Sequence, residues 1–196
     1  MKIIGGEFKR LAIEMPKDIR PTSNKVREAL FEVLKGSIEG ANFLDLYCGS
    51  GAVGMEALSR GAGKVVFVDN DIKCISVLKK NLGRLDHLAT RVGCPPSAEQ
   101  PTRVPLVDIY NKDAIKALGV FEKEGMVFDV IFLDPPYYKD IAKNTLIEIS
   151  NHDILSANVV IIAEIYKKES LPEEIGVLKK IRTYKYGDTV LELFKR

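Results

Sequence analysis

Histidine and cysteine are scarce in this chain of 196 residues. It contains two histidines and three cysteines, namely His87, His152, Cys48, Cys74 and Cys94. No two cysteines form a C-x-x-C pair, and so few histidines argue against a bound metal cluster. The odd number of cysteines fits a reducing compartment better than a disulfide framework. Because no histidine lies near Cys48 in sequence, we expect a packed thiol there and not a nucleophile.

Long apolar runs are also missing. No segment approaches the roughly 20 apolar residues of a membrane-spanning helix, and the N-terminus carries no apolar signal-peptide core. We therefore expect no membrane association and a cytoplasmic location. With 46% hydrophobic residues, the chain can bury a core large enough for one enzyme domain without disulfide bonds.

The net positive charge of the chain is low, but an excess of basic residues is concentrated near the N-terminus. The formal net charge is +2. Residues 1–27 hold seven basic and three acidic residues, which amounts to +4 and leaves −2 for the remainder. A basic segment on a nearly neutral body is typical of an element that contacts nucleic-acid phosphates, although a solvated hairpin with a lysine-rich edge is an equal alternative. The residues predicted to make these contacts are Lys9, Arg10, Arg20, Lys25 and Arg27.

The segment Asp134-Pro135-Pro136-Tyr137 directly follows the apolar residues 130–133. An exocyclic amino group on a nucleobase is a poor nucleophile, because its lone pair is delocalised into the ring. A carboxylate and a backbone carbonyl that accept both N–H hydrogen bonds would localise this lone pair and direct it outward. Asp134 and the carbonyl of Pro135 can supply these acceptors, in a loop stiffened by consecutive prolines. The segment thus predicts amine methylation.

Tyr137 closes this segment with an aromatic ring. Stacking of a base on such a ring is worth roughly 1–3 kcal/mol and tolerates every base, so Tyr137 would hold the target without identifying it. The segment also has a simpler interpretation as a turn that ends a strand, because aspartate and proline are ordinary turn residues. A second motif favours the catalytic interpretation.

This second motif is a glycine-rich segment after an earlier apolar run. Residues 43–54 read FLDLYCGSGAVG and place Gly49, Gly51 and Gly54 at the spacing G-x-G-x-x-G. Glycines permit positive φ and close approach of a ligand, and the next helix offers free N–H groups at its N-terminus. Asp69 ends the following predicted strand, about 20 residues on, where a carboxylate suits a ribose diol. The motif predicts a nucleotide-type cofactor, which can be NAD or S-adenosylmethionine.

Two aspartates favour S-adenosylmethionine. Asp45 lies inside the predicted strand, where a carboxylate can pair with the ammonium of a methionine group but would repel a pyrophosphate. Asp134 follows a later strand, and the carboxyl ends of parallel strands meet at one crevice. NAD chemistry gives no role to residues 134–137. Simpler roles remain open, because Asp45 can accept hydrogen bonds from backbone amides and Asp69 can begin a helix.

Hydrophobic periodicity predicts an α/β fold with a doubly wound, mostly parallel sheet. Residues 2–14 alternate around Gly5-Gly6 and predict a β-hairpin. An amphipathic helical stripe consists of Val26, Ala29, Leu30, Val33 and Leu34. The predicted parallel strands are 42–47, 64–69, 107–111, 128–133 and 158–165. Residues 176–196 predict an antiparallel hairpin with its turn at Gly187-Asp188.

Together with its N-terminal segment, the chain resembles a known family. The RsmD-type 16S ribosomal RNA guanine-N2 methyltransferases combine such a glycine loop and an Asp-Pro-Pro-aromatic loop with a distinctive N-terminal pattern. Here the pattern is carried by residues 3–10 (IIGGEFKR), 20–22 (RPT) and 26–31 (VREALF). Many amino-methyltransferases share each catalytic motif, including adenine-N6 enzymes, so the N-terminal pattern points to this family. The resemblance extends over nearly the whole chain.

The resemblance implies a Rossmann-like class I fold dependent on S-adenosylmethionine, with a seven-stranded sheet and a C-terminal antiparallel hairpin. From the methionine end to the adenine edge, the implied cofactor-binding residues are Asp45, Gly49, Gly51, Asp69 and Asp113. The implied catalytic residues are Asp134, Pro135 and Tyr137, with Asp134 on the target amine. A helix N-cap is an alternative role for Asp113.

The expected organisation is a basic β-hairpin appendage in residues 1–22, which contacts RNA, and a methyltransferase domain in residues 23–196. The expected partner is 16S ribosomal RNA or the small ribosomal subunit, and the protein is expected to be a monomer. Prolines between residues 91 and 106 forbid a helix and predict an exposed loop, which we interpret as an insertion peculiar to this chain.

The predicted activity is methyl transfer from S-adenosylmethionine to the exocyclic N2 amine of a guanine in 16S ribosomal RNA. Three alternatives stay open. An adenine-N6 or cytosine-N4 methyltransferase uses the same acceptor geometry, and a NAD-dependent oxidoreductase shares the glycine loop. A non-catalytic RNA-binding assembly factor could retain the same fold.

Overall fold

The computed structural model describes residues 1–16, 23–89, 106–137 and 140–196, with the backbone alone for residues 86–89. Two predictions lie outside these described residues: the RNA contact of Arg20, and the proline-rich loop up to residue 105. The boundary expected after residue 22 falls at the end of a segment that is not described, so it stays a prediction.

One eight-stranded sheet forms the centre of the molecule, in the order β3-β2-β1-β4-β5-β8-β7-β6. The five strands from β3 to β5 pair in parallel, and the three strands after them pair antiparallel. The bounds are β1 Asn42–Leu46, β2 Lys64–Asp69, β3 Leu106–Asn111, β4 Phe128–Leu133, β5 Leu155–Tyr166, β6 Glu174–Ile175, β7 Leu178–Tyr186 and β8 Thr189–Lys195. The predicted fold class is confirmed, and the two-residue β6 adds an eighth strand at one edge.

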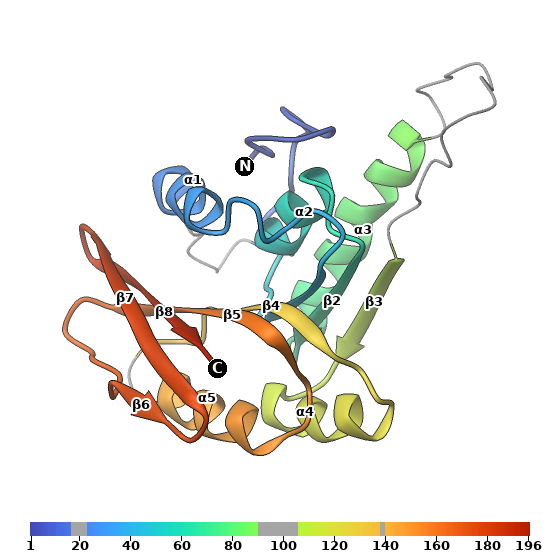
Figure 1. The fold of residues 1–196 in the computed structure, drawn as a ribbon. Coiled ribbons are helices and arrows are strands. Elements are labelled where there is room, and N and C mark those ends of the chain that lie inside the picture. The colour runs from blue at the N-terminus through green and yellow to red at the C-terminus, as the bar shows by residue number, and fades with distance from the viewer. Residues whose placement is uncertain (17–22, 90–105, 138–139) are drawn as a thin grey trace.

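Helices cover both faces of the sheet and give the domain three layers (Figure 1). On one face lie α1 (Asn24–Val33), α2 (Ala52–Ser59) and α3 (Ile72–Ala89), and on the other α4 (Ala114–Lys123) and α5 (Ile141–Asn151). Two hydrophobic clusters fill the spaces between the sheet and these helical layers. Within the described residues, no helix has both the length and the apolar composition needed to span a membrane.

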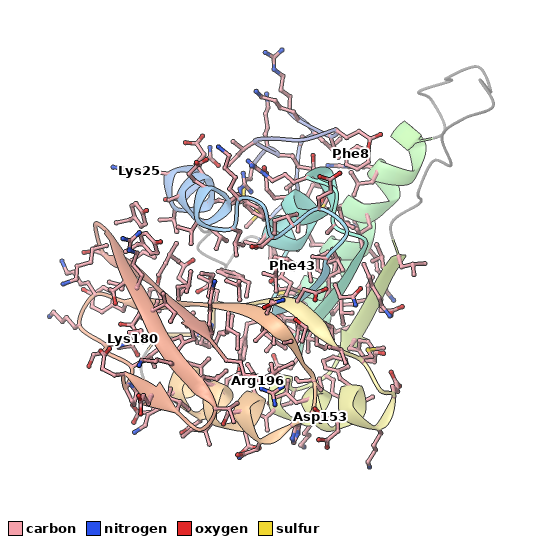
Figure 2. All side chains as sticks on the ribbon, viewed as in Figure 1. Phe8, Lys25, Phe43, Asp153, Lys180 and Arg196 are labelled. Atoms are coloured by element: carbon pink, nitrogen blue, oxygen red, sulfur yellow. The ribbon has the colours of Figure 1, made fainter. Side chains whose placement is uncertain are left out.

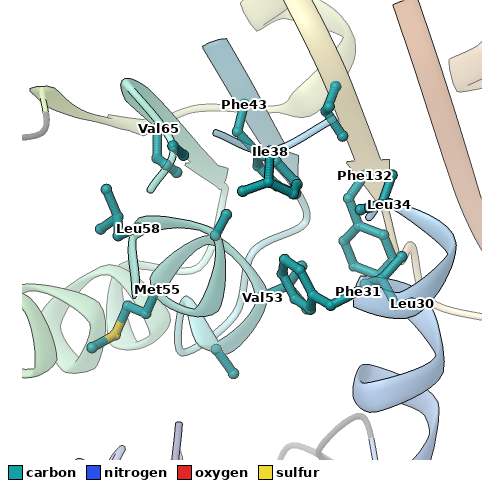
Figure 3. Packing of buried hydrophobic residues seen from close by; sticks show 14 of the residues in the cluster. Leu30, Phe31, Leu34, Ile38, Phe43, Val53, Met55, Leu58, Val65 and Phe132 are labelled. Atoms are coloured by element: carbon teal, nitrogen blue, oxygen red, sulfur yellow. The ribbon is translucent and has the colours of Figure 1, made fainter. Parts of the chain in front are cut away.

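Alternate residues of the central strands enter the two hydrophobic clusters. Phe43 of β1, Val65 of β2 and Phe132 of β4 pack beneath α1 and α2 (Figure 3). Leu44 and Val66, one residue further along their strands, face the layer of α4 and α5. Because both faces are buried, these strands are continuous apolar runs, which is why periodicity located them.

The N-terminal segment folds back on itself as predicted, but as a short, irregular hairpin: the N–H groups of Ile3, Arg10 and Ile13 donate to the carbonyls of Leu11, Ile3 and Met1. Among the described residues, its bridge pairing is limited to Lys2 with Ala12. The N–H groups of Ile4 and Gly5 donate to the two carboxylate oxygens of Glu56 on α2, each at 2.8 Å. These N–H groups are engaged by α2 and not by the opposite arm of the hairpin, which explains why the ladder ends at Ile3.

This segment packs closely on the α/β core. Ile3 and Ile13 are buried in the cluster beneath α1 and α2. Gly6 has a φ of 73°, and a Cβ added there would lie 1.7 Å from the carbonyl oxygen of Ser59. The Glu7 N–H donates to the same oxygen at 2.7 Å. Only glycine permits so close an approach to α2 with this backbone conformation.

Arg27 is buried, so the prediction that it contacts RNA is wrong. Its side chain is 0% exposed, and its Nε lies 3.9 Å from Oε2 of the equally buried Glu56. The guanidinium donates to the Lys2 carbonyl and to Asn24 Oδ1, the latter at 3.2 Å. Arg60 Nε lies 2.8 Å from Glu56 Oε1. Burial lowers the pKa of Arg27, and the charge of Glu56 opposes this shift. Arg27 therefore anchors the N-terminal segment to α1 and α2.

Candidate active site

A cleft opens where the parallel strands end. β1 marks the switch point of the sheet, because β2 and β3 continue on one side of it and β4 and β5 on the other. Ligands of open α/β sheets bind beyond the carboxyl ends of the strands near such a point. The cleft has a volume of about 570 Å³, within the roughly 300–1,000 Å³ typical of small-molecule sites. Its walls bring together Asp45, Gly49, Asp69, Asp134, Pro135 and Tyr137.

The glycine loop connects β1 to α2 through left-handed residues. Gly49 has a φ of 54° and Gly51 a φ of 78°, values that favour glycine. A Cβ added at Gly49 would project into open space, beside the cleft that this residue lines. A Cβ added at Gly51 would lie 2.2 Å from Leu78 Cδ1. Gly51 thus serves the packing of α3, and it is not among the described residues that line the cleft.

Asp45 is buried in the cleft wall near the end of β1. It is 1% exposed, and its Oδ2 accepts a hydrogen bond from the Gly54 N–H of α2 at 2.9 Å. This bond is the simpler of its two predicted roles. Burial, with smaller contributions from the charges of Asp134 and Asp69, raises the pKa of Asp45 to about 8, although the Gly54 bond opposes the shift. These three carboxylates would gain from a cationic ligand group.

Asp69 ends β2 and holds two turns in place. Its Oδ2 accepts the Gly49 N–H and its Oδ1 accepts the Asp71 N–H, both at 2.8 Å. The carboxylate thereby ties the glycine loop to the end of the neighbouring strand. Carboxylate oxygens can each accept more than one hydrogen bond, so a ligand hydroxyl can still bind here.

Asp113 caps α4, which is the alternative role predicted for it. Its side chain accepts the Lys116 N–H at 3.1 Å. Asp113 is not among the described residues that line the cleft, whereas Tyr47 is. Burial raises the pKa of Tyr47. A hydrogen bond with Thr145 opposes this rise, and the charge of Asp113 adds to it. Asp113 therefore lies near Tyr47, and its contact with a ligand stays a prediction.

The Asp-Pro-Pro-Tyr segment leaves the sheet at the tip of β4. The Asp134 N–H donates to the Leu46 carbonyl at 3.4 Å, which continues the pairing of β4 with β1 by one residue. The Tyr137 hydroxyl donates to Glu164 Oε1 at 3.4 Å. The rings of Tyr137 and Tyr166 lie 5.6 Å apart between their centroids. The segment is thus supported by β1 on one side and β5 on the other.

Cys48 lines the cleft as a buried thiol. Burial raises the pKa of Cys48 well above its ordinary value, and the charges of Asp45 and Asp69 add to the shift. The thiol therefore stays protonated and is a weak nucleophile. Across the described residues, no group of three or more histidine, cysteine, aspartate or glutamate side chains is arranged to hold a metal ion.

Asn81 of α3 connects the N-terminal segment to the glycine loop, a role that the sequence analysis missed. Its buried Nδ2 donates to the carbonyls of Glu14 and Ser50 at 3.0 and 3.1 Å, and its Oδ1 accepts the Glu14 N–H at 2.8 Å. Ser50 Oγ lies 3.0 Å from Met15 Sδ, and both residues line the cleft. The N-terminal segment is therefore part of the cleft wall, through contacts that no local pattern reveals.

Two further cleft residues come from the C-terminal half of the chain, Glu164 on β5 and Tyr186 on β7. Glu164 is 3% exposed. Its signal in the sequence is a single carboxylate within the otherwise apolar residues 159–165 (VVIIAEI), because buried acids are rare outside functional or paired positions. Tyr186 precedes the hairpin turn, and no signal distinguishes it from an ordinary strand residue.

Three of the residues predicted to contact RNA lie at the surface. Lys9 and Arg10 are exposed in the N-terminal loop, and Lys25 is exposed on the first turn of α1. Figure 2 shows Lys25 extending away from the body of the domain. Their exposure is compatible with phosphate contacts, which stay a prediction.

Comparison with known proteins identifies the family. The family described as Conserved hypothetical protein 95 matches residues 1–195. The chain belongs to this family, that of the RsmD-type methyltransferases. The Bacillus subtilis protein YlbH is 33% identical over 198 residues, which cover 100% of this chain and 99% of that protein. Ribosomal RNA small subunit methyltransferase D of Haemophilus influenzae is 33% identical over 187 residues, which cover 93% of this chain and 89% of that protein.

A solved structure titled as a putative methyltransferase has the same fold. The Escherichia coli protein yhhF superposes with a TM-score of 0.81 and 28% sequence identity, over 100% of this chain and 97% of its own length. The match extends over the N-terminal segment as well as the α/β core.

Proposed function

We propose that this protein transfers a methyl group from S-adenosylmethionine to the exocyclic N2 amine of a guanine in 16S ribosomal RNA. One observation carries the proposal: Asp134 and Pro135 at the tip of β4 line the same cleft as Gly49 and Asp69 at the ends of β1 and β2. The motif assigned to the amine and the motif assigned to the nucleoside therefore share one cleft. The names of RsmD-type relatives support ribosomal RNA as the substrate, which would place the protein in the cytoplasm.

The cleft residues fit S-adenosylmethionine. Asp45 presents a carboxylate to the methionine ammonium beside the N-terminus of α2, whose free N–H groups suit the methionine carboxylate. Asp69 can accept hydrogen bonds from the ribose hydroxyls in addition to those from Gly49 and Asp71. When bound, the cofactor supplies an electrophilic methyl group on a positively charged sulfur.

The role of the protein is mainly positional. Asp134 and the Pro135 carbonyl accept the two N–H hydrogen bonds of the target amine and direct its lone pair toward the methyl carbon. A separation of about 3–3.5 Å between nitrogen and methyl carbon then suffices for transfer. Asp134 accepts the proton released by the methylated nitrogen or passes it to water. Tyr137 stacks on the base after it has been unstacked from its neighbours in the RNA.

A labelled methyl-transfer assay tests this function. Purified protein is incubated with labelled cofactor and unmodified small ribosomal subunits or naked 16S RNA, and the label is mapped by nucleoside analysis. N2-methylguanosine is the expected product. Label on adenine N6 or cytosine N4 would show that the same acceptor pair serves another base. Absence of label with both substrates would favour a non-catalytic factor, and binding of NADH would favour the oxidoreductase alternative.

Cofactor binding should strengthen as the pH rises. The pKa of Asp45 is about 8 in the free protein, so at lower pH this carboxyl is mostly protonated. Pairing with the methionine ammonium requires the charged form, so binding releases a proton. Between about pH 6 and 7.5, the Kd should fall nearly tenfold per pH unit. Calorimetry over this range measures the slope, and Asp45→Asn should remove it. A Kd independent of pH would contradict the role given to Asp45.

RNA binding should depend on the basic N-terminal face. Replacement of Lys9, Arg10 and Lys25 by alanine should make the negative slope of log K against log salt shallower by about 2–3, because each phosphate contact contributes roughly 0.7–0.9. The matched control replaces exposed lysines on the opposite helical layer, namely Lys116, Lys123 and Lys143. Filter binding at several salt concentrations provides the slopes. Equal slopes for the two triple variants would remove the N-terminal face from the interface.

A further inference from the structure

Glu164 is a buried carboxylate in the wall of the cleft, and neither the glycine loop nor the Asp-Pro-Pro-Tyr segment accounts for it. It lies two residues before the end of β5 and is 3% exposed. Burying a carboxylate is costly unless it serves hydrogen-bond donors. One such donor is the Tyr137 hydroxyl, at 3.4 Å from Oε1. The same side chain lines the cleft that contains Asp134.

The register of the sheet places Glu164 beside Asp134. Leu133 of β4 is paired with Ala163 of β5, so the next residues in the two parallel strands are neighbours. Phe132 and Ile162, two residues earlier than Asp134 and Glu164, enter the same hydrophobic cluster. Since side chains alternate along a strand, Asp134 and Glu164 lie on this same face of the sheet. Glu164 therefore lies close to a base whose amine binds to Asp134.

The chemistry of a carboxylate suits one base edge. Guanine carries a donor N1–H next to its N2 amino group. Adenine and cytosine carry an unprotonated ring nitrogen, an acceptor, next to their amino groups. A buried acceptor forms a hydrogen bond with the N1–H of guanine. It disfavours adenine and cytosine, because two acceptors would then face each other without a hydrogen. Tyr137 cannot make this distinction, because every base offers a stacking face.

We propose that Glu164 determines the specificity for guanine by accepting a hydrogen bond from N1–H, while Asp134 and the Pro135 carbonyl hold the N2 amine. This inference rests on the proposed function. The Tyr137 hydroxyl contacts Oε1 of the same carboxylate, so the stacking ring and the residue that identifies the base lie side by side.

The test replaces the mapped target guanine by 2-aminopurine in RNA prepared by ligation. This analogue keeps the 2-amino group, but its N1 is an acceptor. For the unmodified protein, kcat/KM should be at least about 100-fold lower with 2-aminopurine, since a site built for a donor rejects an analogue that lacks it. In Glu164→Gln, the amide can donate to this N1 or accept from guanine. The ratio between the two substrates should therefore fall to within about tenfold.

Tyr137→Phe is the matched control, because it removes the hydroxyl that donates to Glu164 and keeps the ring. It should retain a guanine preference close to that of the unmodified protein. If Glu164 acted only by holding Tyr137, both variants would lower the rate with guanine by the same factor and leave the preference unchanged. That result would overturn the inference. Calorimetry should show equal cofactor affinity in Glu164→Gln and the unmodified protein, and thermal unfolding reports on its fold.

Comparable rates of the unmodified protein with guanine and 2-aminopurine would also overturn the inference, without any variant. The proposed function fails in a different way. In that case the label would be missing from guanine N2 altogether, whatever residue occupies position 164.

Discussion

Replacement of Asp134 by alanine should lower kcat about 10²–10³-fold, because the target amine then keeps only the Pro135 carbonyl as an acceptor. Asp134 lies at the tip of β4, beside the end of β1, and none of the contacts proposed for the cofactor uses its side chain. The Kd for S-adenosylmethionine should therefore stay within about twofold of its original value. Labelled methyl transfer under single-turnover conditions measures the first effect, and calorimetry measures the second.

Asp69→Ala is the matched contrast to this variant. Asp69 holds Gly49 and Asp71 through both carboxylate oxygens, so its loss loosens the glycine loop and removes the acceptor proposed for the ribose. Cofactor affinity should fall first, and saturating cofactor should restore much of the rate. Should Asp134→Ala weaken cofactor binding as strongly as Asp69→Ala does, the assignment of Asp134 to the amine would be wrong.

Arg27→Ala should destabilise the fold by about 3 kcal/mol, the lower end of the range for removing one partner of a buried ion pair, because Arg60 still pairs with Glu56. The variant removes the ion pair with Glu56 and the hydrogen bonds to the Lys2 carbonyl and Asn24. Denaturant unfolding measures the loss as a lower midpoint at an unchanged slope.

Lys25→Ala on the same helix is the control for Arg27→Ala. Lys25 is exposed, so its replacement should change the free energy of unfolding by less than about 0.5 kcal/mol. The two basic residues are two positions apart on α1 and differ in burial. Equal effects of the two substitutions would contradict the buried role of Arg27.

The central strands β1, β2 and β4 were predictable because each is buried on both faces. These three strands begin and end within one residue of their predicted bounds, and so does the edge strand β3, which has no buried residue. β5 begins at Leu155, three residues earlier than predicted. Its first half includes the exposed Ala157 and Asn158 at the periphery of the sheet, where apolar patterning is weak. Strand pairing extends there without the burial that periodicity detects.

The cleft was predictable in part because its motifs follow strands. Asp45, Gly49, Asp69 and Asp134 stand at or near the carboxyl ends of parallel strands, and the switch point brings such ends together. The spacing of the glycines does not reveal which of them lines the cleft and which is needed for helix packing. Gly51 is needed for the approach of Leu78 from α3, a contact across 27 positions that the local sequence does not encode.

By itself, the sequence determined the order of strands and helices, the two motifs and the family, because these depend on local periodicity, on turn chemistry and on residue types at short spacing. Only the tertiary structure decided which charges are buried. Arg27 looks like an ordinary charged residue along the chain, and Glu164 is marked only by its apolar neighbours, yet one anchors the N-terminal segment and the other lies in the cleft wall. Burial depends on which distant segments pack against a side chain, and the energy of a charge depends on that burial more than on its neighbours in sequence.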